Sequence, residues 1–336
     1  MTDGTTGAAR ADPPTPPLWL TVEGGGPRLA LRHRPAIGPR SGPPVLFVHG
    51  ATLASELYDV AGTSGPSGYS WMRHAAVHGR DAFALDIRGY ARSERPSSFE
   101  QPPGEGEPYA THREAVADIG RAADLVRERT GADHIDLVGG SWGSITSAIY
   151  ATRHADALRR LVLFAPIFAE ANEGWLDITA DPPDRSRPNP APSPALGAYR
   201  LVTRAAVRER WDAEIPGEPT AFRPEAVFDA LMDEALAADP LATTHDPPAM
   251  RVPNGTLIDL HEAFSGRPLY DPAAIRTPTL LIRGDCDPTS TASDMARLAA
   301  RLPNAHALTI PNASHFAIAE HAAPAVFEAA EAFLRR

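Results

Sequence analysis

The sequence predicts an α/β protein whose mostly parallel sheet is covered by helices on both faces. Short apolar runs bounded by prolines and glycines indicate strands that are buried on both sides. Helical patterns lie between these runs, and such alternation is typical of parallel sheets. With 336 residues, 43% of them hydrophobic, the chain is long enough to bury such a core and to carry an insertion.

The expected elements follow one another along the chain. Residues 18–22 and 28–33 are predicted to form a hairpin that turns at three consecutive glycines, Gly24 to Gly26. Buried strands are expected at residues 44–48, 81–87, 134–138, 161–165, 279–282 and 307–310. Helices are expected at residues 111–131, 142–154 and 295–302, and from residue 324 onward. The first of these helices begins with a capping-box pattern, Thr111 to Glu114.

This alternation of strands and helices stops between residues 167 and 272. The stretch contains proline-rich segments at 181–194 and 216–224 and helical patterns at 198–211 and 224–238. An insertion at this point is expected over the carboxyl ends of the strands, where open α/β sheets place their sites. We therefore expect a lid (cap) domain at 167–272 over a core of residues 18–166 and 273–336, with a disordered tail at 1–17.

Composition excludes several classes of function. The net charge of −10 argues against a nucleic-acid partner, and all 32 basic residues are arginines, so Schiff-base and P-loop lysine chemistry are excluded. The single cysteine, Cys286, cannot form an internal disulfide, and no apolar run suggests a signal peptide or a membrane span. We expect a cytoplasmic protein with a small-molecule substrate and with no membrane, metal or cofactor; its oligomeric state stays open.

The strongest motif is Gly139-Gly140-Ser141-Trp142-Gly143. This G-x-S-x-G pattern lies between a predicted buried strand and a predicted helix, where it places a serine on a sharp turn. The glycines leave room for that turn, and the helix N-terminus directs positive partial charge toward a developing oxyanion. The pattern predicts Ser141 as a nucleophile.

A serine nucleophile needs a base and a carboxylate that orients the base. His315 follows the last predicted strand, so it is expected at the same edge of the sheet as Ser141. Asp287 follows the preceding buried strand and is the preferred carboxylate. Three other carboxylates stay open as alternatives: Asp285, Glu170 and Glu173.

Two backbone N–H groups are expected to stabilise the oxyanion. One belongs to Trp142, and the other to Ala51, with Thr52 as the second choice, in the loop after the first buried strand. An apolar pocket for the substrate is expected from residues near this loop and in the lid: Thr52, Trp175, Tyr199, Trp211, Phe264 and Tyr270.

The chain resembles the α/β-hydrolase superfamily over residues 18–336. The resemblance is carried by five blocks in the same order: 45–50, 86–93, 139–143, 284–287 and His315. It implies the α/β-hydrolase fold, with an eight-stranded, mostly parallel sheet flanked by helices and a helical lid inserted after strand six. It also implies cofactor-free acyl transfer to water, with Ser141, Asp287 and His315 as nucleophile, acid and base and with Ala51 and Trp142 as oxyanion donors.

Two departures from the family pattern limit what the resemblance implies. The block D-x-R-G-x-G-x-S has Ala91 in place of its second glycine, which alters the backbone of a turn. The block from Gly139 to Ser144 resembles that of proline iminopeptidases, but these enzymes carry an H-G-G-P-G loop where this chain has His49-Gly50-Ala51-Thr52-Leu53. A serine nucleophile also argues against haloalkane dehalogenases and epoxide hydrolases, which use aspartate.

The expected activity is hydrolysis of a small carboxylic ester, lactone or thioester through an acyl-enzyme on Ser141. An aminopeptidase resembling proline iminopeptidase stays open, and the acidic residues of the lid would suit the free amine of its substrate. A biosynthetic acyltransferase or cyclase that uses the same three residues is a further alternative. The last alternative is a non-catalytic binding protein on a hydrolase scaffold.

Overall fold

The computed structural model describes residues 17–60, 68–179 and 196–336 of the chain. The predicted tail at 1–17 lies outside the described residues except for Pro17, and so does the proline-rich segment 181–194. In the described part of the chain, none of the helices is both long and apolar enough to cross a membrane.

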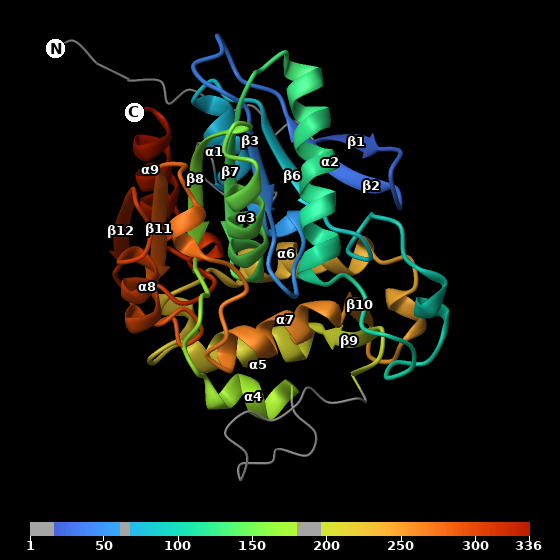
Figure 1. Ribbon diagram of the computed structural model, residues 1–336. Helices are drawn as coiled ribbons and strands as arrows, with labels where there is room; N and C mark the ends of the chain where they lie inside the picture. Colours follow the sequence, from blue (N-terminus) through green and yellow to red (C-terminus); the bar gives the residue numbers. More distant parts are fainter. Residues whose placement is uncertain (1–16, 61–67, 180–195) are drawn as a thin grey trace, which may run out of the picture.

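An eight-stranded sheet forms the centre of the molecule (Figure 1). Its strands lie in the order β1-β2-β6-β3-β7-β8-β11-β12. Their bounds are Leu18–Val22 (β1), Leu29–Arg34 (β2), Val45–Val48 (β3), Ala82–Asp86 (β6), Ile135–Gly140 (β7), Leu158–Phe164 (β8), Thr279–Gly284 (β11) and Ala305–Ile310 (β12). β2 pairs antiparallel with β1 and β6, and the other neighbours pair parallel. All the strands expected from the sequence are present, and the α/β prediction is confirmed. The expected burial of residues 307–310 is wrong, because β12 lies at the edge of the sheet and Ala307, Leu308 and Thr309 are exposed.

Helices cover both faces of this sheet because the side chains of its strands are apolar on both. In β3, Leu46 and Val48 belong to one apolar cluster, and Val45 and Phe47 belong to the other. The first cluster includes α2 (His112–Thr130), α3 (Trp142–Arg153) and α8 (Ala292–Ala299). The second includes α9 (Ala323–Leu334) and α1 (Trp71–Val77), a helix that the sequence patterns did not indicate. Between β3 and α1 lies a short antiparallel pair, β4 (Asp59–Val60) and β5 (Tyr69–Ser70).

The segment between β8 and β11 lies at the carboxyl ends of the strands, where Figure 1 shows its helices below the sheet. It contains α4 (Glu173–Thr179), α5 (Arg204–Glu214), α6 (Glu225–Ala237) and α7 (Gly255–Phe264), together with an antiparallel pair, β9 (Tyr199–Thr203) and β10 (Ala249–Pro253). The described residues also contain six 3-10 turns: Ser55–Tyr58 (η1), Ser97–Glu100, Pro219–Ala221, Ala242–Thr244, Pro272–Ala274 and Ala317–Ala319.

The helix expected at residues 198–211 is wrong in its first half. Tyr199–Thr203 is a strand because it pairs along its whole length with β10, and its aromatic and β-branched residues suit a strand. The helix begins only at Arg204, where the Thr203 hydroxyl caps it by accepting the Ala206 N–H at 3.1 Å. The insertion is therefore not purely helical.

Candidate active site

Ser141 occupies the sharp turn between β7 and α3. Its backbone has φ 56° and ψ −123°, a conformation that costs a non-glycine residue energy. A Cβ on Gly139 would lie 2.3 Å from the Gly143 carbonyl oxygen, and a Cβ on Gly143 would lie 2.3 Å from that of Val48. Only glycine fits at either position, so the motif packs as the sequence predicts.

Ser141, His315 and Asp287 are joined by two hydrogen bonds, although they are far apart in the sequence. His315 Nε2 lies 2.8 Å from Ser141 Oγ, and His315 Nδ1 lies 2.8 Å from Asp287 Oδ2. Asp287 is 3% exposed and His315 is 7% exposed. Because a carboxylate only accepts, Nδ1 carries the proton, and Nε2 is free to accept the proton of the serine hydroxyl.

The remaining oxygen of Asp287 is held by the backbone. Its Oδ1 accepts the N–H groups of Thr289 and Ser290, both at 2.8 Å. These bonds fix the orientation of the carboxyl group toward His315. The turn after β11 therefore holds the hydrogen-bond acceptor of the histidine in one position.

The alternative carboxylates lie elsewhere. Asp285 accepts the Ala313 N–H at 3.2 Å, which fits its expected role in shaping the turn. Glu170 accepts hydrogen bonds from the hydroxyls of Thr291 and Ser293. Glu173 begins α4. Asp287 is the aspartate that the structure places against the His315 ring.

A second carboxylate contacts His315, and no sequence pattern indicated it. Glu214, at the end of α5, accepts the backbone N–H of His315 through Oε2 at 3.0 Å. Its side chain is only 6% exposed, and burial raises the pKa of its carboxyl group. The contact joins residues that are 101 positions apart, so no spacing motif could reveal it.

Of the predicted oxyanion donors, Trp142 follows Ser141 in the chain, and Ala51 lines the same cavity as Ser141. Trp142 is the first residue of α3, where helix N–H groups lack partners within the helix. Ala51 follows Gly50, on which a Cβ would lie only 3.0 Å from the Cβ of Ser141. Among the described residues, no hydrogen bond occupies the N–H of Ala51 or Trp142.

A comparison of the sequence with known protein families agrees with this geometry. Residues 43–322 match the family described as the alpha/beta hydrolase fold. The chain belongs to the α/β-hydrolase family. A search of curated proteins found no match to the chain.

Solved structures show that other proteins share this α/β-hydrolase architecture. E-2-(acetamidomethylene)succinate hydrolase has a TM-score of 0.64 at 18% identity, over 95% of this chain and 100% of that one. An esterase from Exiguobacterium antarcticum has a TM-score of 0.62 at 14% identity, over 93% and 97% of the two chains. A malate-bound esterase from Thermogutta terrifontis has a TM-score of 0.61 at 20% identity, over 96% and 98%.

Two side chains hold the carbonyl of Ala51 in this α/β hydrolase. The oxygen accepts the Tyr90 hydroxyl at 2.9 Å and Arg200 Nη2 at 2.7 Å. Tyr90 comes from the block 86–93 and Arg200 from β9, so core and insertion both fix this loop. Because these two hydrogen bonds hold the Ala51 carbonyl, they fix the orientation of the peptide between Ala51 and Thr52.

The indole of Trp142 joins the nucleophile turn to two other elements. Its Nε1 donates to Asp259 Oδ2 at 2.8 Å, and Asp259 belongs to α7 of the insertion. The same carboxylate accepts the backbone N–H of His112 at 2.6 Å and lies 2.5 Å from His112 Nδ1, at the start of α2. Burial raises the pKa of Asp259, and these hydrogen bonds oppose that effect.

Ser141 and His315 face a cavity between the core and the insertion. It is lined by Gly50, Ala51, Thr52, Leu53, Leu57, Tyr58, Gly140, Ser141, Phe164, Trp175, Arg210, Leu260, His315, Phe316 and Ile318. A second cavity shares Thr52, Trp175, Arg210 and Phe316 with the first and is completed by Ile178, Arg200, Val202, Ala206, Val207 and Leu257. Thr52 and Trp175 therefore line the space beside the serine, as the sequence suggests.

The other four aromatic residues expected in the pocket line neither cavity. Trp211 is fully buried and donates its indole N–H to Glu320 at 2.7 Å. The Tyr199 hydroxyl donates to the Gln101 carbonyl at 2.7 Å, and its ring packs against Phe99. Phe264 stacks on Trp175, and Tyr270 packs beside Phe168, with ring centres 5.4 and 5.6 Å apart. These aromatic side chains pack within apolar clusters that the insertion shares with the rest of the molecule.

Proposed function

We propose that this α/β hydrolase cleaves a small carboxylic ester through an acyl-enzyme on Ser141. The observation that carries the proposal is the hydrogen-bonded series from Asp287 through His315 to Ser141, at the wall of a cavity. Both bonds are already at productive length, and the serine lies at the head of a helix. In this proposal the insertion between β8 and β11 acts as a lid, since its Trp175 and Arg210 line the cavity.

The mechanism follows from the positions of these groups. Ser141 Oγ attacks the ester carbonyl carbon while His315 Nε2 takes the hydroxyl proton, and Asp287 stabilises the imidazolium. The N–H groups of Ala51 and Trp142 bind the oxyanion of the tetrahedral intermediate. When that intermediate collapses, His315 gives its proton to the departing alcohol. A water then attacks the acyl-enzyme, again losing its proton to His315, and the acid leaves with Ser141 restored.

The lining of the cavities supports an ester over an aminopeptidase substrate. An aminopeptidase needs carboxylates to hold the free amine of its peptide. Among the described residues, the two cavities are lined by two arginines and by no Asp or Glu. Positive side chains repel an ammonium group, so the described lining of these cavities supports an ester over the free amine of a peptide.

A fluorophosphonate probe followed by peptide mapping tests the proposal most directly. We expect the probe to modify Ser141, and we expect Ser141→Ala to abolish both labelling and hydrolysis of 4-nitrophenyl butyrate. Folded protein that is neither labelled nor active would overturn the proposal and favour a binding protein. Faster turnover of proline 4-nitroanilide than of any ester would favour the peptidase, and an ester product formed with added alcohol would indicate acyl transfer.

A further inference from the structure

We propose that the ester substrate also carries a carboxylate group, which Arg210 and Arg200 bind inside the insertion. The inference rests on the proposed esterase function, because it names the substrate class of the same site. It would restrict the enzyme to half-esters of dicarboxylic acids or to esters of hydroxy acids.

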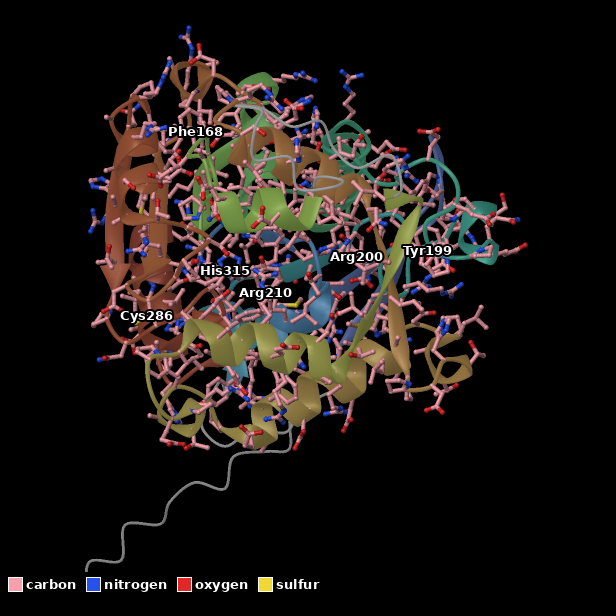
Figure 2. The ribbon with its side chains drawn as sticks, turned by 90° about the horizontal axis from the view of Figure 1, so that it is seen from below. Phe168, Tyr199, Arg200, Arg210, Cys286 and His315 are labelled. Atoms are coloured by element: carbon pink, nitrogen blue, oxygen red, sulfur yellow. The ribbon has the colours of Figure 1, made fainter. Side chains whose placement is uncertain are left out.

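Arg210 lies where the two cavities meet. It lines both of them, together with Ser141 in the first and Arg200 in the second. In the view of Figure 2, from below, Arg210 lies between His315 and Arg200. A group bound by this guanidinium would therefore lie next to the reacting ester.

Aromatic rings hold the Arg210 guanidinium in place, but its N–H groups make no hydrogen bond to a described residue. Its Cζ lies 4.9 Å from the ring centre of Trp175 and 5.6 Å from that of Phe316, so two aromatic faces hold it. Its nearest carboxylate is that of Glu214, whose Oε2 accepts the His315 N–H and whose Oε1 lies 3.7 Å from Arg210 Nε, an ion pair without a hydrogen bond. No hydrogen bond joins the guanidinium to a described residue, and the side chain is 32% exposed.

Arg200 is a cation without a carboxylate partner among the described residues. Its Nη1 donates to the Pro253 carbonyl at 2.9 Å and to Asn254 Oδ1 at 3.1 Å, and its Nη2 donates to the Ala51 carbonyl at 2.7 Å. These acceptors are neutral. Burial lowers the pKa of Arg200, and the nearby charge of Arg210 lowers it further. Arg200 is half-buried, and a partly desolvated charge without a counter-ion is costly, so an anion beside it would be stabilising.

The remaining surface of the second cavity is mostly apolar. Ile178, Val202, Val207 and Leu257 surround the two guanidinium groups. Two like charges in such a space repel one another, and a carboxylate that accepts from both replaces repulsion with attraction. An apolar segment that ends in a carboxylate, with the ester at Ser141, matches this distribution.

Matched pairs of esters test the proposal. Monomethyl adipate is compared with methyl hexanoate, and 6-acetoxyhexanoate with hexyl acetate, so that the carboxylate lies once on the acyl side and once on the alcohol side. We expect kcat/KM to favour the anionic member of at least one pair by about tenfold or more, as for a charge-assisted hydrogen bond. The preference should shrink as salt rises from 0.05 to 0.5 M.

Arg210→Gln is the decisive variant, and Arg204→Gln is its matched control. Arg204 lies on the same helix and pairs with Asp229, but it lines neither cavity. Arg210→Gln should reduce the anionic preference to about threefold or less, whereas Arg204→Gln should leave the ratio unchanged. Arg200→Gln should reduce it as well, and if that variant fails to fold, Arg210→Gln alone decides.

Different results would contradict the carboxylate site and the esterase function. If the fluorophosphonate labels Ser141 and neutral esters turn over as fast as their anionic partners, the carboxylate site is wrong while the esterase function stands. An anionic preference that survives Arg210→Gln also overturns the carboxylate site. If neither labelling nor hydrolysis occurs in folded protein, the proposed function itself is wrong.

Discussion

Replacing Asp287 by asparagine should move the ring proton of His315 from Nδ1 to Nε2. The aspartate Oδ1 accepts two backbone N–H groups, from Thr289 and Ser290. An asparagine must place its carbonyl oxygen at this position, because its NH2 group cannot accept those hydrogen bonds. The NH2 group then faces His315 Nδ1, which must accept, so the imidazole proton moves to Nε2 and points at Ser141.

The wrong tautomer cannot take the serine proton, which gives the expected size of the effect. A proton on His315 Nε2 blocks deprotonation of Ser141, so kcat should fall about 10⁴-fold, roughly 5.5 kcal/mol of barrier. The assay is hydrolysis of 4-nitrophenyl butyrate, with the rate of fluorophosphonate labelling as a second measure. Asp285→Asn is the matched control, since Asp285 binds the Ala313 N–H in the same turn. A loss below about tenfold in Asp287→Asn, with unchanged melting temperature, would refute the reasoning.

Three further predictions concern the surroundings of the site. Gly143→Ala should lower esterase activity more than about 100-fold and reduce the melting temperature, because its Cβ would lie 2.3 Å from a carbonyl oxygen of β3; Gly174→Ala, with space for a Cβ, should change neither. Ala91→Gly should raise the free energy of unfolding in urea by up to about 1 kcal/mol, because Ala91 has φ 38°, and a decrease would contradict this. Glu214→Gln can still accept the His315 N–H. Because burial raises the carboxyl pKa, the charged form of Glu214 costs stability as the pH rises above the ordinary value of about 4.3. The variant should therefore gain melting temperature relative to the parent at pH 8 but not at pH 4, and an equal difference at both would count against the assignment.

Local patterns in the sequence predicted the core and the three aligned side chains. Ser141, Asp287 and His315 each follow a strand of the parallel part of the sheet, and the carboxyl ends of such strands all lie at one edge. Each strand can be recognised from its own apolar run. Because the strands are parallel, residues that directly follow them are expected at the same edge of the sheet. The glycines of the serine motif add a steric requirement that few other sequences meet.

The insertion could not be predicted in the same way, because distant partners decide its structure. Tyr199–Thr203 is a strand only because β10 pairs with it, and β10 begins 46 residues after β9 ends (249 − 203). Its aromatic residues pack against each other or against the core, which composition cannot distinguish from lining a pocket. The contacts of Glu214 with His315 and of Asp259 with Trp142 span 101 and 117 residues. Neither has a local signature.

The carboxylate of Asp259 also restricts how substrate can reach the serine. It accepts from Trp142 beside the nucleophile and from His112 at the head of α2, so α7 cannot swing away without leaving these buried groups unpaired. Hydrogen exchange of α7 and of the first turn of α3 should therefore report a single opening event. For the proposed esterase, we therefore expect ester and acid to pass the parts of the insertion that lie away from α7.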